Sequence, residues 1–306
     1  MINTSEIRDK SKELGFSACG FARAEPLPLG SFLDEWVAHS LHGNMHYMEK
    51  NMDRRLNPEL LFPGVKTIIP LLASYYKEGY KPGENLKVSR YAVGRDYHKV
   101  LKKRGQALID WMGEMKPGIR ARIFVDTAPI MEKEWARKAG LGWIGKNTCL
   151  IRPGEGSWFF IGIIMTDLEL TPDPPENRNL CGNCSRCIDN CPTKALSANG
   201  ILDARKCISY LTIELKDRIS DEYTGQTDNW LFGCDRCQEV CPSNRFAKET
   251  LIQDFEPRPI FHSISSQTFC QMDQNDFTRE FSGTCLTRAG LEKIKGTISF
   301  LYPDDI

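Results

Sequence analysis

Seven cysteines lie in two short runs, and their spacing is typical of metal binding. The first run, CGNCSRCIDNCP, has the pattern C-x2-C-x2-C-x3-C-P, with cysteines at Cys181, Cys184, Cys187 and Cys191. In two-cluster iron–sulfur proteins, three thiolates of such a run bind one [4Fe–4S] cluster and the fourth reaches a second cluster. A tetrahedral zinc site uses paired C-x2-C units and would leave the third and fourth thiols without a role. The first run therefore predicts an iron–sulfur cluster.

The second run, CDRCQEVCP, is one cysteine short of the first. It supplies Cys234, Cys237 and Cys241, and Leu231 stands where the missing ligand would be. Two cubane clusters need four thiolates each, so one more cysteine must take part. Cys207 lies between the runs and is the nearest candidate, with Cys149 as the alternative. We predict Cys181, Cys184, Cys187 and Cys241 for cluster 1, and Cys191, Cys207, Cys234 and Cys237 for cluster 2.

Composition and charge restrict the class of protein that could carry these clusters and its place in the cell. The 306 residues carry 40 basic and 40 acidic side chains, which excludes a globally basic nucleic-acid binder. The N-terminal stretch MINTSEIRDKSKELGF has no apolar core of a signal peptide, and no window is apolar enough to span a membrane. Twelve cysteines in such a chain favour metal ligands over disulfides. We therefore expect a cytoplasmic protein without a membrane anchor.

Two low-potential clusters form an electron conduit, and a conduit needs a final acceptor. The stretch before the cysteines must provide it, and it is typical of a mixed α/β domain. Strands rich in β-branched and aromatic residues are predicted at 66–74, 122–126 and 158–166, and helices at 96–115 and 129–140. The second helix is expected to open with Pro129 and close at Gly140. The proline-rich segment 171–180 predicts a domain boundary.

Asp126 is the most suggestive single residue of this part. It ends a predicted strand just before a helix, where carboxylates often border ligand crevices. Aspartate is also a favoured helix cap, and the residues alone leave both roles open. The nearby segment GLGWIGKN matches G-x4-G-K, but Asn147 replaces the magnesium-binding hydroxyl and the segment follows a helix. It therefore does not predict a phosphate loop, although its glycines let a large flat or anionic ligand approach closely.

The segment RYAVGRDYHKVLKKRG concentrates positive charge. Lys99, Lys102, Lys103 and Arg104 belong to a solvated helix face or, with aromatic residues interleaved, to a nucleic-acid contact. The five histidines show no metal-ligand spacing, and we expect structural or surface roles for them. They are His39, His42, His46, His98 and His262.

Taken together, these motifs resemble the epoxyqueuosine reductase family, whose members use cobalamin and iron–sulfur clusters in the queuosine modification of tRNA. The matching stretches are RRLNPELLFPGVKTII, YAVGRDYHKVL, VDTAPIMEKEWARKAGLGWIGKN, the two cysteine runs and CISYLTIE, all within residues 1–250. The resemblance implies an α+β fold: a mixed α/β cobalamin-binding catalytic domain (1–175), a bacterial-ferredoxin-like domain with two [4Fe–4S] clusters (176–250) and a short, partly helical C-terminal extension (251–306). It also implies that Cys207 is the eighth cluster ligand.

The resemblance further assigns roles to individual residues. Asp126 is implied as the catalytic proton donor, and burial beside a large apolar corrinoid would raise its pKa and keep it protonated. The cobalamin pocket would be lined by Arg54, Asp96, Tyr97, Asp126, Lys146, Asn147, Trp158, Ser209 and Asp235. Contacts to tRNA would come from Lys99, Lys102, Lys103 and Arg104.

The implied reaction converts epoxyqueuosine at the tRNA wobble position to queuosine, the last step in making that nucleoside. Electrons would pass through both clusters to cobalamin, from a low-potential donor such as flavodoxin or ferredoxin. The implied partner is a tRNA with a GUN anticodon, and we expect a monomer. A corrinoid enzyme of the reductive dehalogenase type is one alternative, although Arg54 and Arg55 lie too deep for the usual twin-arginine export signal. An iron–sulfur electron carrier whose N-terminal part docks a partner is the other.

Overall fold

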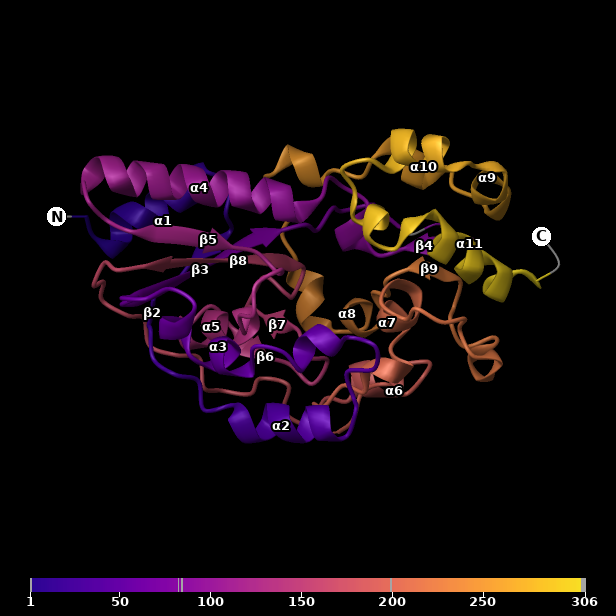
Figure 1. The fold of residues 1–306 in the computed structure, drawn as a ribbon, viewed down its shortest axis with the longest axis horizontal. Helices are drawn as coiled ribbons and strands as arrows, with labels where there is room; N and C mark the ends of the chain where they lie inside the picture. The colour runs from indigo at the N-terminus through magenta and orange to yellow at the C-terminus, as the bar shows by residue number, and fades with distance from the viewer. Residues whose placement is uncertain (1, 82, 84, 199, 304–306) are drawn as a thin grey trace.

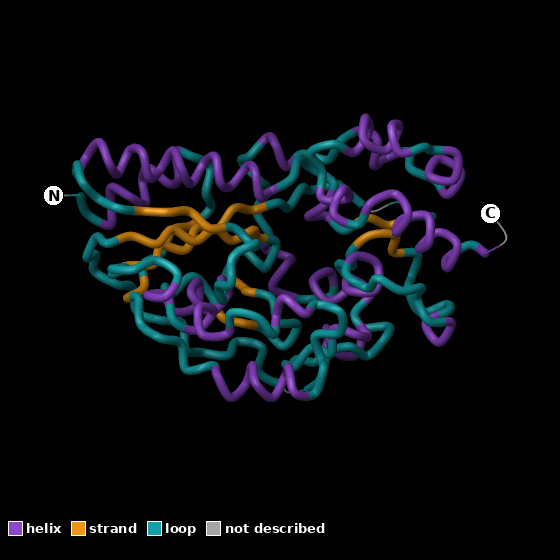
Figure 2. Tube along the Cα trace, viewed as in Figure 1, coloured by secondary structure: helices purple, strands orange, loops and turns teal. Residues whose placement is uncertain are grey.

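The computed structural model describes residues 2–303 except 82, 84 and 199. Its centre is an antiparallel sheet in the order β1–β3–β8–β5, and β2 pairs with the same edge of β3 as β1. The strands form one layer between helices, as Figure 2 shows. Their bounds are β1 Ala18–Cys19, β2 Ala22–Arg23, β3 Thr67–Ser74, β5 Ala121–Phe124 and β8 Phe159–Thr166.

The two long strands, β3 and β8, hold the sheet together. They pair along their whole length, from Thr67 opposite Thr166 to Ser74 opposite Phe159. Every residue of β3 is buried, because both faces of the sheet are covered. The strands predicted at 66–74 and 158–166 are confirmed to within a residue. The third, predicted at 122–126, ends at Phe124, so Asp126 lies in the following loop.

Helices cover both faces of this sheet (Figure 1). On one face α4 (Tyr97–Met115) packs with α1 (Thr4–Glu13), and Leu101 and Leu108 of α4 share a core with Leu71 and Ile164. Gly105 lets α4 approach the sheet closely, since a Cβ there would lie 2.7 Å from the Ile123 side chain. On the other face lies α5 (Glu132–Lys138), whose buried tryptophan packs against the opposite sides of β3 and β8. The mixed α/β architecture is as predicted.

The bounds predicted for the helix at 129–140 are wrong at both ends. It begins at Glu132 and ends at Lys138, with Met131 as its N-cap residue. The preceding residues turn instead, because the N–H of Ile130 donates to the carbonyl of Ala128. Pro129 therefore belongs to the loop that carries Asp126, and this loop is longer than the sequence pattern suggested.

The cysteine-rich part folds into short helices beside a small parallel pair of strands. Strand β4 (Lys87–Val88), before the main domain's long helix, pairs with β9 (Trp230–Phe232), between the two cysteine runs. The short helices are α6 (Arg186–Asp189), α7 (Ile208–Ile213) and α8 (Arg236–Glu239). The segment GLGWIGKN leads into the hairpin of β6 (Trp143–Ile144) and β7 (Leu150–Ile151).

The C-terminal residues form three helices, α9 (Ser266–Gln271), α10 (Gln274–Phe281) and α11 (Gly290–Leu301). They are not a loose appendage, because Phe269, Phe277 and Phe281 share one core with Phe232 of β9. Figure 1 shows these helices over β4 and β9, at the end of the molecule away from the main sheet. The remaining helices, α2 (Gly30–Ala38) and α3 (Met52–Leu56), lie on the α5 side of the sheet.

The three predicted stretches share hydrophobic cores. Ile252 and Phe255 pack into the core of the first stretch beside Val125 and Phe160. The segment 171–180 has no helix or strand, yet Asp173 within it accepts hydrogen bonds from Arg8. The division at 175 and 250 stays a prediction about function. Among the described residues, no helix is long and apolar enough to cross a membrane.

Candidate active site and cluster-binding thiols

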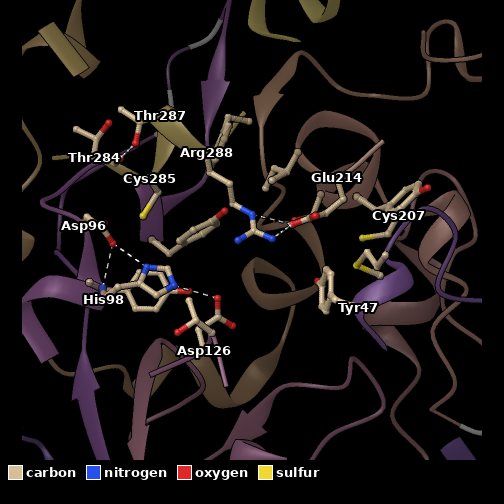
Figure 3. A pocket seen from close by; sticks show the side chains of 18 of the residues that line it. Tyr47, Asp96, His98, Asp126, Cys207, Glu214, Thr284, Cys285, Thr287 and Arg288 are labelled. Carbon is tan, nitrogen blue, oxygen red and sulfur yellow. Dashed lines mark hydrogen bonds and ion pairs between the residues drawn. The ribbon is translucent and has the colours of Figure 1, made fainter. Parts of the chain in front are cut away.

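A cavity of about 810 Å³ lies between the end of the main sheet and the cysteine-rich part. Its wall comes from segments far apart in the chain (Figure 3). These include Met45 and Tyr47 before α3, Asp96, Tyr97, His98, Lys99 and Lys102 of α4, Asp126 and Thr127 after β5, Cys207, Ser209 and Glu214 around α7, and Thr284, Cys285, Thr287 and Arg288 before α11. The cavity therefore joins a predicted cluster ligand to the predicted proton donor.

Asp126 enters this cavity from the loop between β5 and α5. Its backbone has a φ of 56°, in the left-handed region that aspartate tolerates better than most residues. Its N–H donates to Oε1 of Glu132 at 2.6 Å, which fixes the loop to the start of α5. Met131 is the N-cap of α5 and has no side-chain cap bond, so the helix-cap alternative for Asp126 is wrong.

His98 connects Asp126 to Asp96, as Figure 3 shows. Its Nδ1 lies 2.7 Å from Oδ1 of Asp96, and its Nε2 lies 3.0 Å from Oδ2 of Asp126. Asp96 also caps α4 by accepting the backbone N–H of His98. Burial alone would lower the pKa of His98, but the two carboxylates outweigh it and raise this pKa to about 9.

The same contact corrects an expectation about Asp126. The hydrogen bond with His98 lowers the pKa of Asp126 and outweighs its burial, whereas the resemblance implied a raised pKa. At neutral pH, His98 is therefore charged and Asp126 ionised. His98, for which a structural or surface role was expected, lies in the cavity wall between two carboxylates. The only sequence signal for this pair was the short spacing of Asp96 and His98. At the start of α4 this spacing turns both side chains toward the same cavity.

Tyr97 lies beside this pair. Its ring stacks on His98 with centroids 4.1 Å apart and on Phe160 at 4.3 Å. Its hydroxyl contributes a hydrogen bond that helps to lower the pKa of Asp126. Burial raises the pKa of Tyr97 itself, so its hydroxyl keeps its proton. Two proton-bearing side chains thus converge on one carboxylate.

One group of thiols forms where the first run meets the end of the second. Burial raises the pKa of Cys187, and the nearby thiols of Cys181 and Cys241 add to this effect. Burial likewise raises the pKa of Cys241, with Cys181 and Cys184 among the neighbours that add to it. Charges act on each other this way only at short range. These four thiols are neighbours, as the spacing of the two runs would require for cluster 1.

The second group surrounds Cys207. Burial raises the pKa of Cys234, and Cys207 and Cys191 add to the shift. Cys237 is in hydrogen-bond contact with Cys149 and also interacts with Cys207 and Cys234. Both candidates for the eighth ligand therefore lie in this group.

The chemistry of both groups fits iron–sulfur clusters. All twelve cysteines have free thiols, so no disulfide competes for them. The indole N–H of Trp143 donates to Sγ of Cys181 at 3.4 Å, and the N–H of Ala195 donates to Sγ of Cys191 at 3.3 Å. Hydrogen bonds to ligand sulfurs are a means of tuning cluster potentials. The assignment of each thiol to a cluster stays a proposal, which these neighbours support.

The predicted cobalamin contacts fall into two sets. Asp96, Tyr97, Asp126 and Ser209 line the cavity. The others lie elsewhere in the described residues. Lys146 donates to the carbonyls of Gly182 and Cys184, and Asn147 contacts the carbonyl of Cys237. Trp158 and Asp235 are buried near Arg90. Arg54 is exposed on α3. Burial raises the pKa of Asp235 to about 6.

The predicted tRNA contacts also divide. Lys99 and Lys102 line the cavity and are exposed. Lys103 is exposed but does not line it. Arg104 points back into the fold, where it donates to the carbonyl of Leu14 at 2.6 Å.

Sequence reasoning missed the contribution of the C-terminal extension. Arg288 reaches into the cavity and forms an ion pair with Glu214 of the segment after α7, at 2.7 Å (Figure 3). Cys285 lies near Asp96 and Asp126, and burial raises its pKa to about 12. No motif marked these residues, because only the packing of α9–α11 brings them to the cavity.

Three further titratable side chains gather outside the cavity. His42, His46 and Glu49 bring one potential ligand atom each to within 4.8 Å of one another, so the expectation of no metal-like histidine grouping is wrong. The carboxylate lies 2.6 Å from Nε2 of His42 and 2.9 Å from Nδ1 of His46. Nδ1 of His42 has no partner, whereas metal-bound histidines usually anchor their second nitrogen. Hydrogen bonds therefore explain the cluster without an ion.

The fold and these sites define a class of protein: an iron–sulfur oxidoreductase whose cavity joins redox-active thiols to an acid–base pair. Comparison with known families specifies it further. Residues 180–244 match a 4Fe–4S double cluster binding domain, and residues 55–127 match the model described as epoxyqueuosine reductase QueG, DUF1730. The first match confirms the predicted pair of [4Fe–4S] clusters.

Relatives agree over nearly the full length. The epoxyqueuosine reductase of Leadbetterella byssophila is 42% identical over 97% of this chain and 98% of its own. That of Cyclobacterium marinum is 39% identical over 98% of this chain and 96% of its own. The chain belongs to the epoxyqueuosine reductase family, as its motifs indicated.

Solved structures show the same fold. The epoxyqueuosine reductase of Streptococcus thermophilus aligns with a TM-score of 0.88 and 29% identity, over 97% of this chain and 81% of that one. A second epoxyqueuosine reductase, solved with an epoxyqueuosine-modified tRNA stem loop, aligns with a TM-score of 0.86 and 28% identity, over 96% and 80% of the two chains. The matches confirm the predicted α+β fold with its two-cluster part.

Proposed function

We propose that this chain reduces epoxyqueuosine in tRNA to queuosine. The observation that carries the proposal is the cavity itself, which joins Cys207 of the second thiol group to Asp126 in a member of this family. An electron carrier would need exposed clusters but no such cavity. Removal of an epoxide oxygen needs both electrons and protons at one point, and the cavity brings their sources together.

The cavity and its walls fit cobalamin. Met45, Tyr47 and Phe232 offer it a broad apolar and aromatic surface, with Cys207 and Ser209 on the cluster side. When bound, cobalamin supplies a low-potential centre that delivers electrons to the epoxide carbon. The thiols of the two groups would hold the clusters that provide those electrons. The ligands proposed are Cys181, Cys184, Cys187 and Cys241 for cluster 1, and Cys191, Cys207, Cys234 and Cys237 for cluster 2.

This chain's own residues handle the oxygen. Breaking the C–O bond leaves negative charge on oxygen, and an alkoxide is a poor leaving group at neutral pH. Asp126 is the proton donor to this oxygen, because its side chain is 48% exposed within the cavity. Since its carboxylate is ionised at rest, it must take up a proton before it can donate one. General acid catalysis of this kind contributes about 10²–10⁴ in rate.

The substrate nucleoside is part of a tRNA, so the surface around the cavity must also bind RNA. The exposed Lys99 and Lys102 at the cavity mouth are placed to contact tRNA phosphates near a GUN anticodon. The electron donor would be a low-potential protein such as flavodoxin or ferredoxin. The enzyme acts as a monomer in the cytoplasm, where its tRNA substrate is found.

The proposal is tested with anaerobically purified protein, cobalamin, a low-potential reductant and an epoxyqueuosine-containing tRNA stem loop. Mass spectrometry of the nucleosides should show loss of one oxygen atom. A stem loop that remains unchanged with intact clusters and bound cobalamin would contradict the proposal.

A further inference from the structure

The proposed reaction consumes more protons than Asp126 can hold. Conversion of an epoxide to an alkene takes two electrons and two protons and releases one water. Both protons go to the same oxygen: the first after the C–O bond to the attacked carbon breaks, the second as the remaining C–O bond breaks and water leaves. Asp126 is ionised at neutral pH and can hold only one proton at a time, so it must be protonated before each of the two steps.

His98 is placed to recharge it. Its Nε2 lies 3.0 Å from Oδ2 of Asp126, within hydrogen-bond reach, while Nδ1 is anchored by Asp96 at 2.7 Å. The anchor orients the ring, because Asp96 is itself fixed as the N-cap of α4. Tyr97 stacks on the imidazole and prevents it from turning away. The His98 side chain is 20% exposed, so it stays in contact with water.

We propose that His98 is the proton reservoir of this site, passing a proton through Nε2 to Asp126 before each of the two protonations of the oxygen. This inference rests on the proposed function. The line Asp96–His98–Asp126 holds the proton as a charged imidazole between two carboxylates. After the transfer, His98 is neutral. Its Nδ1–H still donates a hydrogen bond to Asp96, and Nε2 takes up a new proton from water.

The surrounding charges favour the charged imidazole. Asp96 and Asp126 contact the imidazole, and Glu132 acts on it from the start of α5. Lys99 acts on Asp96, Arg288 acts on Asp126, and Cys285 lies near both carboxylates. Burial raises the pKa of Glu132 to about 8, so this group adds little negative charge near neutral pH. The two carboxylates in direct contact dominate and raise the pKa of His98 to about 9.

A first experiment measures the protonation of His98 without turnover. Diethyl pyrocarbonate modifies neutral imidazoles, and mass spectrometry locates the modified residue in the cluster-containing protein. The pH midpoint for His98 should lie near 9, and it should fall in Asp96→Asn and Asp126→Asn because each removes a carboxylate. The exposed His39 serves as the internal reference. A midpoint for His98 near 6.5 in all three proteins would overturn the inference.

A second experiment follows turnover of the epoxyqueuosine stem loop across pH. His98→Gln should slow it about 10²-fold and remove its decline above the His98 midpoint, while His39→Gln changes neither. His98→Ala should regain activity with added imidazole, which a merely structural loss would not allow. Full activity and an unchanged pH profile in His98→Gln would refute the reservoir. Failure of the native protein to reduce the stem loop would instead refute the proposed function, and the modification experiment would still decide the protonation of His98.

Discussion

Replacing Asp126 by asparagine separates its chemistry from its structural role. Asparagine accepts the left-handed φ of 56° as readily as aspartate. It also leaves α5 intact, because Asp126 does not cap that helix. The variant loses one partly exposed ion pair with His98, a loss of about 0.5–1 kcal/mol. Fold, clusters and cofactor binding should therefore survive.

The rate of turnover should fall strongly in the same variant. An amide has no acidic proton for the departing oxygen, so turnover of the epoxyqueuosine stem loop should fall about 10²–10⁴-fold. Single-turnover assays with pre-reduced protein measure this step without limits from the electron donor. Asp110→Asn on the exposed side of α4 is the matched control and should keep native turnover. Native turnover in Asp126→Asn would show that another group protonates the oxygen.

Three further outcomes are expected. Cys207→Ala should lose about half of the iron, the share of one [4Fe–4S] cluster, whereas Cys149→Ala should keep all of it; the reverse pattern would make Cys149 the eighth ligand. Replacing Lys99 and Lys102 by glutamine should weaken tRNA binding and reduce its salt dependence by about two slope units; unchanged binding across salt would return both to a solvated helix face. Native turnover should decline as pH rises through about 9, where His98 loses its proton, and a flat profile to higher pH would contradict the raised pKa.

Local patterns predicted the parts of this protein that depend on neighbours in sequence. The cysteine spacing indicated iron–sulfur clusters because seven of the eight predicted ligands lie a few positions apart within two runs. The strands at 66–74 and 158–166 were predictable for the same reason, since a strand covered on both faces is a largely apolar run. The helix after Asp126 was misplaced because Pro129, a good first residue of a helix, stands in a loop instead.

The cavity depended on contacts that sequence spacing does not show. His98 meets Asp126 across 28 positions, and Arg288 meets Glu214 across 74. The first contact requires the start of α4 and the loop after β5 to lie at the same end of the sheet. The second requires the C-terminal helices to pack on β9, which puts a segment without any motif into the cavity wall. The depressed pKa of Asp126 was unpredictable for the same reason, because its cause is a partner distant in sequence.

The most direct test of the account combines cofactor content with chemistry in one sample. Anaerobically reconstituted protein should contain about eight irons and bind one cobalamin, and with a low-potential reductant it should remove one oxygen atom from epoxyqueuosine in the tRNA stem loop. Protein that holds both clusters and cobalamin, yet leaves the epoxide intact, would contradict the central claim that the cavity between Cys207 and Asp126 carries this reduction.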